Sequence, residues 1–166
     1  MTTRSQSGGP QNAAQDVPNL GLVRPPLVYL ISLAAGALIQ IATPFPFLPG
    51  ALALPLGAPL VVLAIALFSY SVAKFQAAGT PVPARKPTTV IVRAGPYRFS
   101  RNPIYLAFSL FQLGIAIWVS SLWLLATLVA AVALIHYVVI PREEQYLERK
   151  FGAQYFDYKA SVRRWL

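Results

Sequence analysis

Two long apolar stretches dominate the chain. Residues 25–73 contain no charged residue, and in residues 102–141 the only ionisable group other than tyrosine is His136. A membrane-spanning helix needs roughly 20 consecutive apolar residues. Each stretch therefore has room for two spans and a turn, which predicts an all-α integral membrane protein with about four transmembrane helices.

Prolines divide the first stretch. Residues 43–50 read Thr-Pro-Phe-Pro-Phe-Leu-Pro-Gly, and three prolines so close together cannot continue a helix. The pattern predicts one span over residues 27–42 and a second over residues 51–75. Pro55 and Pro59 fall early in the second span, where we expect them either to delay its start or to kink it.

The second stretch has to fold back on itself. A single helix over residues 103–140 would be about 57 Å long at 1.5 Å per residue, far more than a bilayer core. Ser120 and Ser121 form the best turn, because Trp118 and Trp123 flank them and tryptophan favours the membrane–water interface. The predicted spans are residues 103–119 and 122–140.

The remaining segments are polar. Residues 1–24 read as a disordered tail rather than a signal peptide, and residues 79–87 as a proline-rich extended loop. We expect Pro141 to end or kink the fourth span. Two short helices follow as an interfacial cap, separated by Gly152, a favourable residue just after a helix end. They are predicted over residues 142–150 and 153–161. The organisation is thus a tail (1–24), two helices (25–75), and a loop, hairpin and cap (76–166).

Composition and charge support a membrane protein. Of 166 residues, 56% are hydrophobic and 11% charged, whereas soluble domains carry roughly 25% charged residues. The net charge is +9, and all 14 Lys and Arg lie in the tail, in residues 74–101 or in residues 142–166. The predicted hairpin turns carry none. With four spans these basic segments share one face, which the positive-inside rule makes cytoplasmic, as expected in a bacterial inner membrane. This orientation role is favoured over nucleic-acid binding.

Residues 93–105 carry the first candidate chemistry. Asn102 is a favourable N-cap and Pro103 a favourable first helical residue. The third span would then open with free N–H groups beside Arg98 and Arg101, which suits a carboxylate or a phosphate. The alternative is an ordinary capped helix whose arginines contact lipid head groups.

The end of the fourth span carries the second. Glu143 lies next to the apolar boundary in a basic chain and needs a partner there, whereas Glu144 and Glu148 fit a solvated helix face. His136 is the one histidine, and a hydrogen bond to a neighbouring helix is favoured over a role as catalytic base. With no cysteine and one histidine, no metal site is indicated.

Taken together, these segments resemble a known family. The runs that carry the resemblance are Gly95-Pro96-Tyr97-Arg98, Arg101-Asn102-Pro103-Ile104-Tyr105, Glu143-Glu144 and Phe151-Gly152-Ala153-Gln154-Tyr155, with Tyr158. They are similar, in order and spacing over residues 85–166, to the isoprenylcysteine carboxyl methyltransferase family, a relative of phospholipid methyltransferases. The combination is specific, although each run alone is weak.

The resemblance implies an S-adenosylmethionine-dependent methyltransferase with its cofactor site at the cytoplasmic face. It implies that Glu143 accepts a hydrogen bond from the cofactor. It also implies that residues 89–92, and Tyr97 with residues 102–105, contact the cofactor. Two departures concern the substrate: Asn102 stands where the family has histidine, and Val139 where eukaryotic members have a substrate-orienting arginine. Arg142 or His136 can take over that arginine's role. The cofactor-binding residues implied are Thr89, Val90, Ile91, Val92, Tyr97, Asn102, Pro103, Ile104, Tyr105 and Glu143.

The methyl acceptor is expected to be lipidic or prenylated and to enter from the bilayer. A long chain cannot easily leave the membrane, since each buried methylene is worth about 0.8 kcal/mol. Arg98, Arg101 or Arg142 would hold an anionic head group. Three alternatives stay open: a phospholipid amine methyltransferase, a nicotinamide-dependent reductase (sterol reductases end in a similar segment) and a non-enzymatic scaffold. The oligomeric state does not follow from the sequence.

Overall fold

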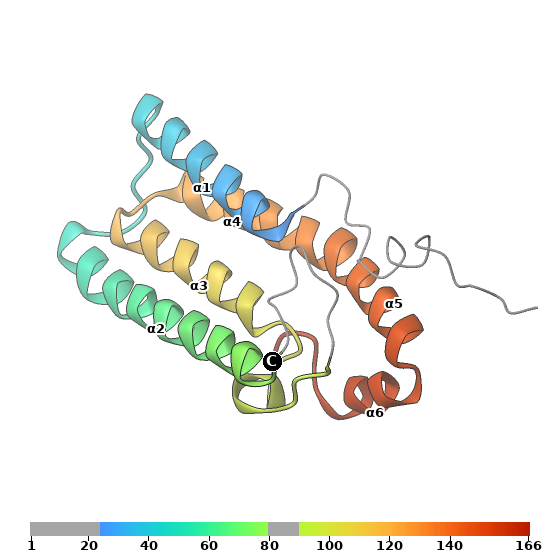
Figure 1. The fold of residues 1–166 in the computed structure, drawn as a ribbon. Helices are drawn as coiled ribbons and strands as arrows, with labels where there is room; N and C mark the ends of the chain where they lie inside the picture. Colours follow the sequence, from blue (N-terminus) through green and yellow to red (C-terminus); the bar gives the residue numbers. More distant parts are fainter. Residues whose placement is uncertain (1–23, 80–89) are drawn as a thin grey trace, which may run out of the picture.

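The computed structural model describes residues 24–79 and 90–166. The chain is mostly helical in this part and has no β-strand there, as predicted (Figure 1). The expected tail and proline-rich loop lie almost entirely outside the described residues, and Thr89 lies outside them as well. The elements are α1 (Pro25–Ala42), α2 (Gly50–Ala77), the 3-10 helix η2 (Gly95–Arg98), α3 (Pro103–Trp118), α4 (Leu122–Leu134), the π-helix η3 (Ile135–Val139), α5 (Ile140–Phe151) and α6 (Ala153–Ser161).

Three helices are long and apolar enough to cross a membrane: α1, α2 and the continuous helix Leu122–Phe151. The third predicted span, α3, is apolar but has only 16 residues. It packs between α2 and α4 (Figure 1). The fold is that of an all-α integral membrane protein.

Each of the two proline predictions named two outcomes, and the structure excludes the first outcome of each. Pro55 and Pro59 do not delay α2, which already begins at Gly50 and contains both. Nor does Pro141 end the fourth span, because the helix runs on to Phe151. The π-turn directly before it explains the continuation: the N–H of Ile140 donates to the carbonyl of Ile135, five residues back. A wider turn accommodates a residue that lacks an N–H and would crowd a preceding carbonyl.

Small residues set how closely the helices approach. A Cβ added to Gly57 of α2 would lie 2.5 Å from the backbone nitrogen of Trp118 and 2.6 Å from the carbonyl oxygen of Gly114, both in α3. One added to Gly36 of α1 would lie 2.7 Å from side-chain atoms of Leu124 and Thr127 in α4. The small residues of the first two helices therefore bring α2 onto α3 and α1 onto α4, as close packing of membrane helices requires.

The two hairpin turns meet at one end of the bundle, which we call the turn end (residues 43–49 and 119–121). Ser120 has a positive φ of 49°. Its hydroxyl accepts hydrogen bonds from the N–H groups of Phe47 (3.0 Å) and Leu48 (2.7 Å) and donates to the carbonyl of Leu48. The indole of Trp123 donates to the carbonyl of Thr43 at 2.7 Å. The turn at Ser120 and Ser121 was correctly predicted.

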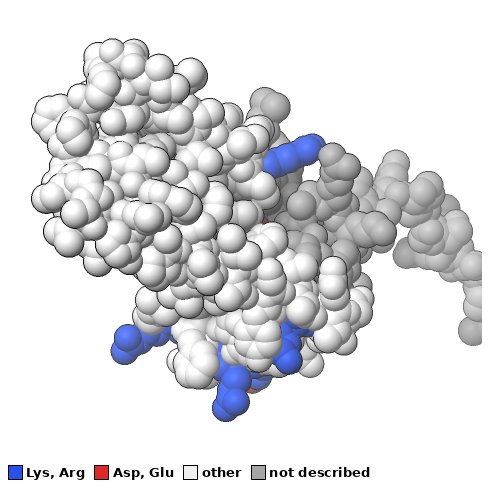
Figure 2. Space-filling model, turned by 90° about the vertical axis from the view of Figure 1, so that its left-hand side faces the viewer, with Lys and Arg blue, Asp and Glu red and all other residues white. Residues whose placement is uncertain are grey.

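The opposite end, the basic end, holds the start of α1, the end of α2, residues 90–102, α5, α6 and the C-terminus (Figure 1). The described Lys and Arg lie in these segments, and in Figure 2 they show along the lower edge and at the upper right beside the grey atoms, while the rest of the face shown is almost entirely uncharged. The turn between α5 and α6 is made by Gly152, whose φ of 52° suits a residue without a side chain. Both cap helices predicted from the sequence form.

Candidate functional site

A cavity of about 220 Å³ opens at the basic end. Its walls come from the start of α1, the end of α2, residues 90–105, α5 and α6. The structure brings nine of the ten residues expected at a cofactor site to this cavity, the tenth being Thr89, outside the described part of the chain. The nine are Val90, Ile91, Val92, Tyr97, Asn102, Pro103, Ile104, Tyr105 and Glu143.

Glu143 has the partner that its position demands. The hydroxyl of Tyr105 donates to its Oε1 at 2.6 Å, joining the first turn of α3 to the first turn of α5. A carboxylate has two oxygens and about four acceptor sites, so this bond leaves Glu143 able to accept hydrogen bonds from a ligand. The spacing of 38 residues between the two is closed by the α3–α4 hairpin.

The backbone of Tyr97 is hydrogen-bonded, whereas its side-chain hydroxyl is not. Its carbonyl accepts a hydrogen bond from the hydroxyl of Tyr158 at 2.8 Å, and its ring meets Phe75 edge-on. The phenolic oxygen is buried and has no hydrogen-bond partner among the described residues. Burial, and secondarily Tyr158, raises the pKa of Tyr97 well above its ordinary value, so the group stays a neutral donor. A buried donor without a partner in a cavity indicates a ligand.

Asn102 occupies the N-cap position of α3, but its side chain does not cap the helix. Its amide nitrogen donates instead to the carbonyl of Arg164 at 3.0 Å, and its backbone N–H donates to the hydroxyl of Ser100. The asparagine is thus committed to the C-terminal segment. The helix N-terminus is left to Pro103, which has no N–H to satisfy.

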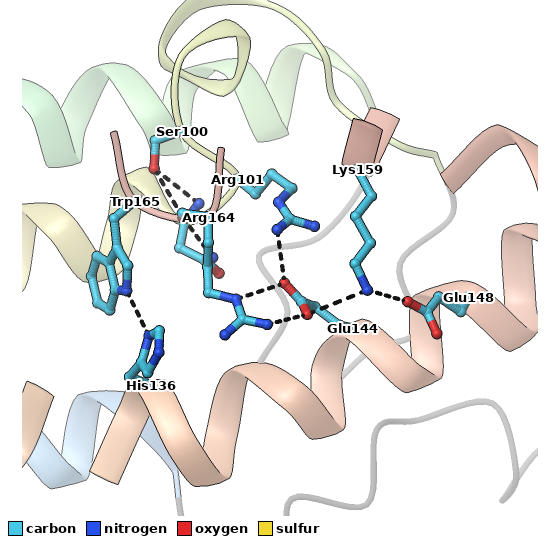
Figure 3. A network of polar contacts seen from close by, with 9 residues as sticks. Ser100, Arg101, His136, Glu144, Glu148, Lys159, Arg164 and Trp165 are labelled. Carbon is cyan, nitrogen blue, oxygen red and sulfur yellow. Dashed lines mark hydrogen bonds and ion pairs between the residues drawn. The ribbon is translucent and has the colours of Figure 1, made fainter. Parts of the chain in front are cut away.

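Arg101 also lines the cavity. Its Nη2 lies 3.3 Å from Oε1 of Glu144, whereas its Nε and Nη1 are buried without partners. Glu144 is 7% exposed at its side chain and takes a two-pronged pair from Arg164, at 3.1 Å and 2.7 Å (Figure 3). That hydrogen bond raises the pKa of Arg164 above its ordinary value. The paired glutamates therefore separate: Glu143 faces the cavity and Glu144 anchors cations.

The other three residues singled out for substrate chemistry do not line the cavity. His136 lies in the π-helix, and its Nδ1 accepts a hydrogen bond from the indole of Trp165 at 3.0 Å (Figure 3). Its partner is thus the C-terminal segment rather than a neighbouring helix. Arg142 is exposed on α5, and Arg98 is exposed at the end of η2.

Several cavity residues escaped sequence reasoning. Tyr155 and Tyr158 of α6 were noted in a family motif without a role at the site, and both line it. Burial raises the pKa of Tyr155 to about 12, so its hydroxyl is neutral, and burial raises that of Tyr158 further. Pro25, Phe68 and Phe75 come from the first two helices, where only hydrophobicity was visible.

A second cavity, of about 300 Å³, lies along α1, α2 and α3 within the apolar part of the bundle. Its lining is apolar apart from Tyr29 and Gln112. Pro26, Phe68 and Phe108 line both cavities, so the two adjoin. The site therefore combines a cavity at the basic end, where a few polar groups stand in a mostly apolar wall, with an apolar cavity between the helices.

Comparison with protein families gives the class of protein, a membrane methyltransferase that acts on lipid. Residues 52–154, more than half of the chain, match the phospholipid methyltransferase family, and the chain belongs to that family. A protein of Haemophilus influenzae described as uncharacterized is 38% identical over 63 residues, which are 38% of this chain and the whole of that protein. No solved structure matches the chain.

Proposed function

We propose that the protein transfers a methyl group from S-adenosylmethionine to a lipid acceptor at the basic end of the bundle. The observation that carries the proposal is the cavity in which a buried tyrosine hydroxyl and a buried guanidinium edge lack partners. Members of the family generally use this cofactor. When bound, it supplies the methyl group on a sulfonium that needs no further activation.

The residues present fit such a cofactor. Tyr97 and Arg101 offer hydrogen-bond donors, which suit the acceptor atoms of a carboxylate or a purine. Glu143 offers acceptor capacity for a ribose hydroxyl or an ammonium group. Apolar and aromatic side chains make up most of the remaining wall and suit the faces of a purine ring. Asn102, Pro103 and Tyr105 complete the floor where α3 begins.

The acceptor's chain would lie in the second cavity. The two cavities share lining residues. A lipid tail between α1 and α2 would therefore bring its head group to the cavity at the basic end without leaving the apolar layer. The chain's own residues would align the two reactants and keep water out, which is what an in-line displacement requires. Arg142, exposed where α5 begins, would attract an anionic head group, while His136 would stay bonded to Trp165.

Two acceptor classes fit this arrangement, an isoprenylcysteine-like carboxylate and a phospholipid amine. A carboxylate is already ionised and needs only a cation to orient it, whereas an ammonium head group has to lose a proton before it can attack. The cytoplasmic face of an inner membrane is the proposed location of the site, since the described basic residues gather at this end.

The decisive test is binding of S-adenosylhomocysteine and of NADPH to the purified full-length protein by calorimetry. We expect binding of the first and none of the second. Glu143→Ala should weaken S-adenosylhomocysteine binding by about 1.5–3 kcal/mol, the range for a hydrogen bond to a charged group. Asp157→Ala, which removes an exposed carboxylate from α6, is the matched control. Binding of NADPH alone would indicate a reductase, and binding of neither a scaffold.

The acceptor class is tested separately. Transfer of a labelled methyl group to phosphatidylethanolamine or to a farnesylated cysteine identifies the chemistry. Either acceptor should outperform its chain-truncated analogue, because remote binding energy positions the reacting centre. Equal catalytic efficiency on the truncated analogue would rule out entry from the bilayer while leaving the cofactor assignment intact.

A further inference from the structure

The last five residues, 162–166, tie two parts of the site together (Figure 3). The backbone N–H of Arg101 donates to the carbonyl of Arg163 at 2.9 Å, and Asn102 donates to the next carbonyl along. On the other side, the indole of Trp165 reaches His136 in the long helix. This C-terminal strap therefore fixes the loop before α3 against the helix that carries the glutamates.

The strap also brings a charge. Arg164 pairs with both oxygens of Glu144 in the fork-to-fork geometry that makes arginine–carboxylate pairs strong. Arg101 reaches the same carboxylate with a single nitrogen, Nη2, and at a longer distance. Lys159 lies between Glu144 (3.8 Å) and Glu148 (2.6 Å). The cluster thus holds three cations against two carboxylates.

The consequence falls on Arg101. Its side chain is 9% exposed, and its Nε and Nη1 have no partner although they are buried. Leaving buried donors of a charged group unpaired is costly. Because Arg101 lines the cavity and the cluster carries an excess positive charge, an oxyanion of a ligand would satisfy these donors.

We propose that the Nε–Nη1 edge of Arg101 binds a ligand oxyanion and that Arg164 is the positioning residue for it. By occupying both oxygens of Glu144, Arg164 keeps that carboxylate from drawing Arg101 into a two-pronged pair of its own. The proposal rests on the function proposed above. The oxyanion has two sources, the carboxylate of the cofactor or the phosphate of the lipid, and the experiment separates them.

The experiment compares ligand pairs that differ by the charged group. S-adenosylhomocysteine is titrated against 5′-methylthioadenosine, which lacks the amino-acid portion, and a phosphatidic acid against the diacylglycerol of the same chains. The full-length protein in detergent is used as wild type, Arg101→Lys and Arg164→Gln. Arg149→Gln, which removes an exposed charge from α5, is the control. The readout is the ratio of the two affinities within each pair, which a general loss of folding does not change.

If the cofactor supplies the oxyanion, the first ratio falls about tenfold or more in Arg101→Lys and Arg164→Gln, the range for a hydrogen bond to a charged group. The second ratio then stays constant. If the lipid supplies it, the pattern reverses. In both cases Arg149→Gln behaves as wild type. A ratio that falls in Arg101→Lys but not in Arg164→Gln overturns the positioning role, and two constant ratios overturn the oxyanion site.

Failure of the proposed function looks different. A wild-type protein that binds neither adenosine compound would remove the cofactor assignment, and the lipid pair would then decide the oxyanion site alone. Restoring the charge with Arg164→Lys supplies the last distinction. A point charge cannot form the forked pair, so this variant should recover only part of the lost ratio. Full recovery would show that charge alone, without the forked pair, positions Arg101.

Discussion

The two ends of the helical bundle use polar groups in opposite ways. At the turn end, the hydroxyl of Ser120 serves three backbone groups and the indole of Trp123 a fourth. At the basic end, Tyr97 and Arg101 point buried donors at a cavity and find no partner for them. At the first end the polar groups pair with one another, whereas at the second the described residues leave buried donors open, as the proposed ligand site requires.

The difference has an energetic reason. An unsatisfied buried polar group costs about 1–3 kcal/mol, so a folded protein keeps few of them, and a bound ligand is one way to recover the loss. At the turn end, the polar groups instead bond the two hairpin turns to each other. The comparison therefore separates residues that stabilise the fold from residues proposed to bind a ligand. Substitutions at either end can test this division.

The largest expected effect concerns the sides of the membrane that the two ends face. The chain has no cysteine, so single cysteines report without background. Gly50→Cys lies beside the turn end and Ala160→Cys in α6 at the basic end, both exposed. In intact cells an impermeant thiol reagent should label the first and not the second, because basic segments stay in the cytoplasm. Labelling of Ala160→Cys alone would invert the proposed orientation.

The next prediction tests the close contact between α2 and α3, which lies between the two ends of the bundle. Gly57→Ala places a Cβ against the backbone of Trp118 and Gly114, which cannot yield as a side chain would. We expect a loss of about 1–3 kcal/mol in unfolding free energy, as for other overpacked sites. Thermal unfolding in detergent measures it. The control is Gly50→Ala, where no atom lies within 4 Å. An equal change in both variants would mean that helix propensity, not contact, is being measured.

A smaller effect should follow from the turn end alone. Ser120→Ala removes the hydroxyl that holds Phe47 and Leu48. We expect a loss of about 1.5 kcal/mol, the upper part of the range for a neutral hydrogen bond, because one group serves three partners. Binding of S-adenosylhomocysteine by the folded protein should not change. A weakened affinity with unchanged unfolding would contradict the division between the two ends.

How much of the structure could be predicted from the sequence depends on whether a feature is set by neighbouring residues or by residues far apart in the sequence. Hydropathy and proline placement gave the helices and both hairpin turns, because these are local properties. They left open whether Pro55, Pro59 and Pro141 interrupt or kink a helix, and none of the three interrupts one, since a helix in an apolar layer keeps its backbone bonds and absorbs a proline by local adjustment. A soluble-protein expectation for proline is too strict here.

The site was predictable where a motif existed. The runs around Tyr97, Tyr105 and Glu143 led to the cavity because their spacing resembles a family. The strap was not foreseen, since nothing local marks Arg164 and Trp165 as partners of Glu144 and His136. Asn102 shows the same limit: its residue type fits an N-cap, yet the tertiary partner, a carbonyl 62 residues away, takes its side chain.

The smallest expected effect makes the sharpest comparison with Ser120. Tyr97→Phe removes one buried hydroxyl that has no partner and leaves the ring against Phe75. In the free protein, stability should therefore stay the same or rise, because an unsatisfied group is gone. Affinity for S-adenosylhomocysteine should fall by about 1 kcal/mol, the net value of a neutral hydrogen bond. Tyr70→Phe, which alters an exposed hydroxyl on α2, is the control. Loss of stability without loss of affinity would show that the hydroxyl of Tyr97 serves the fold, and the contrast between the two ends would no longer hold.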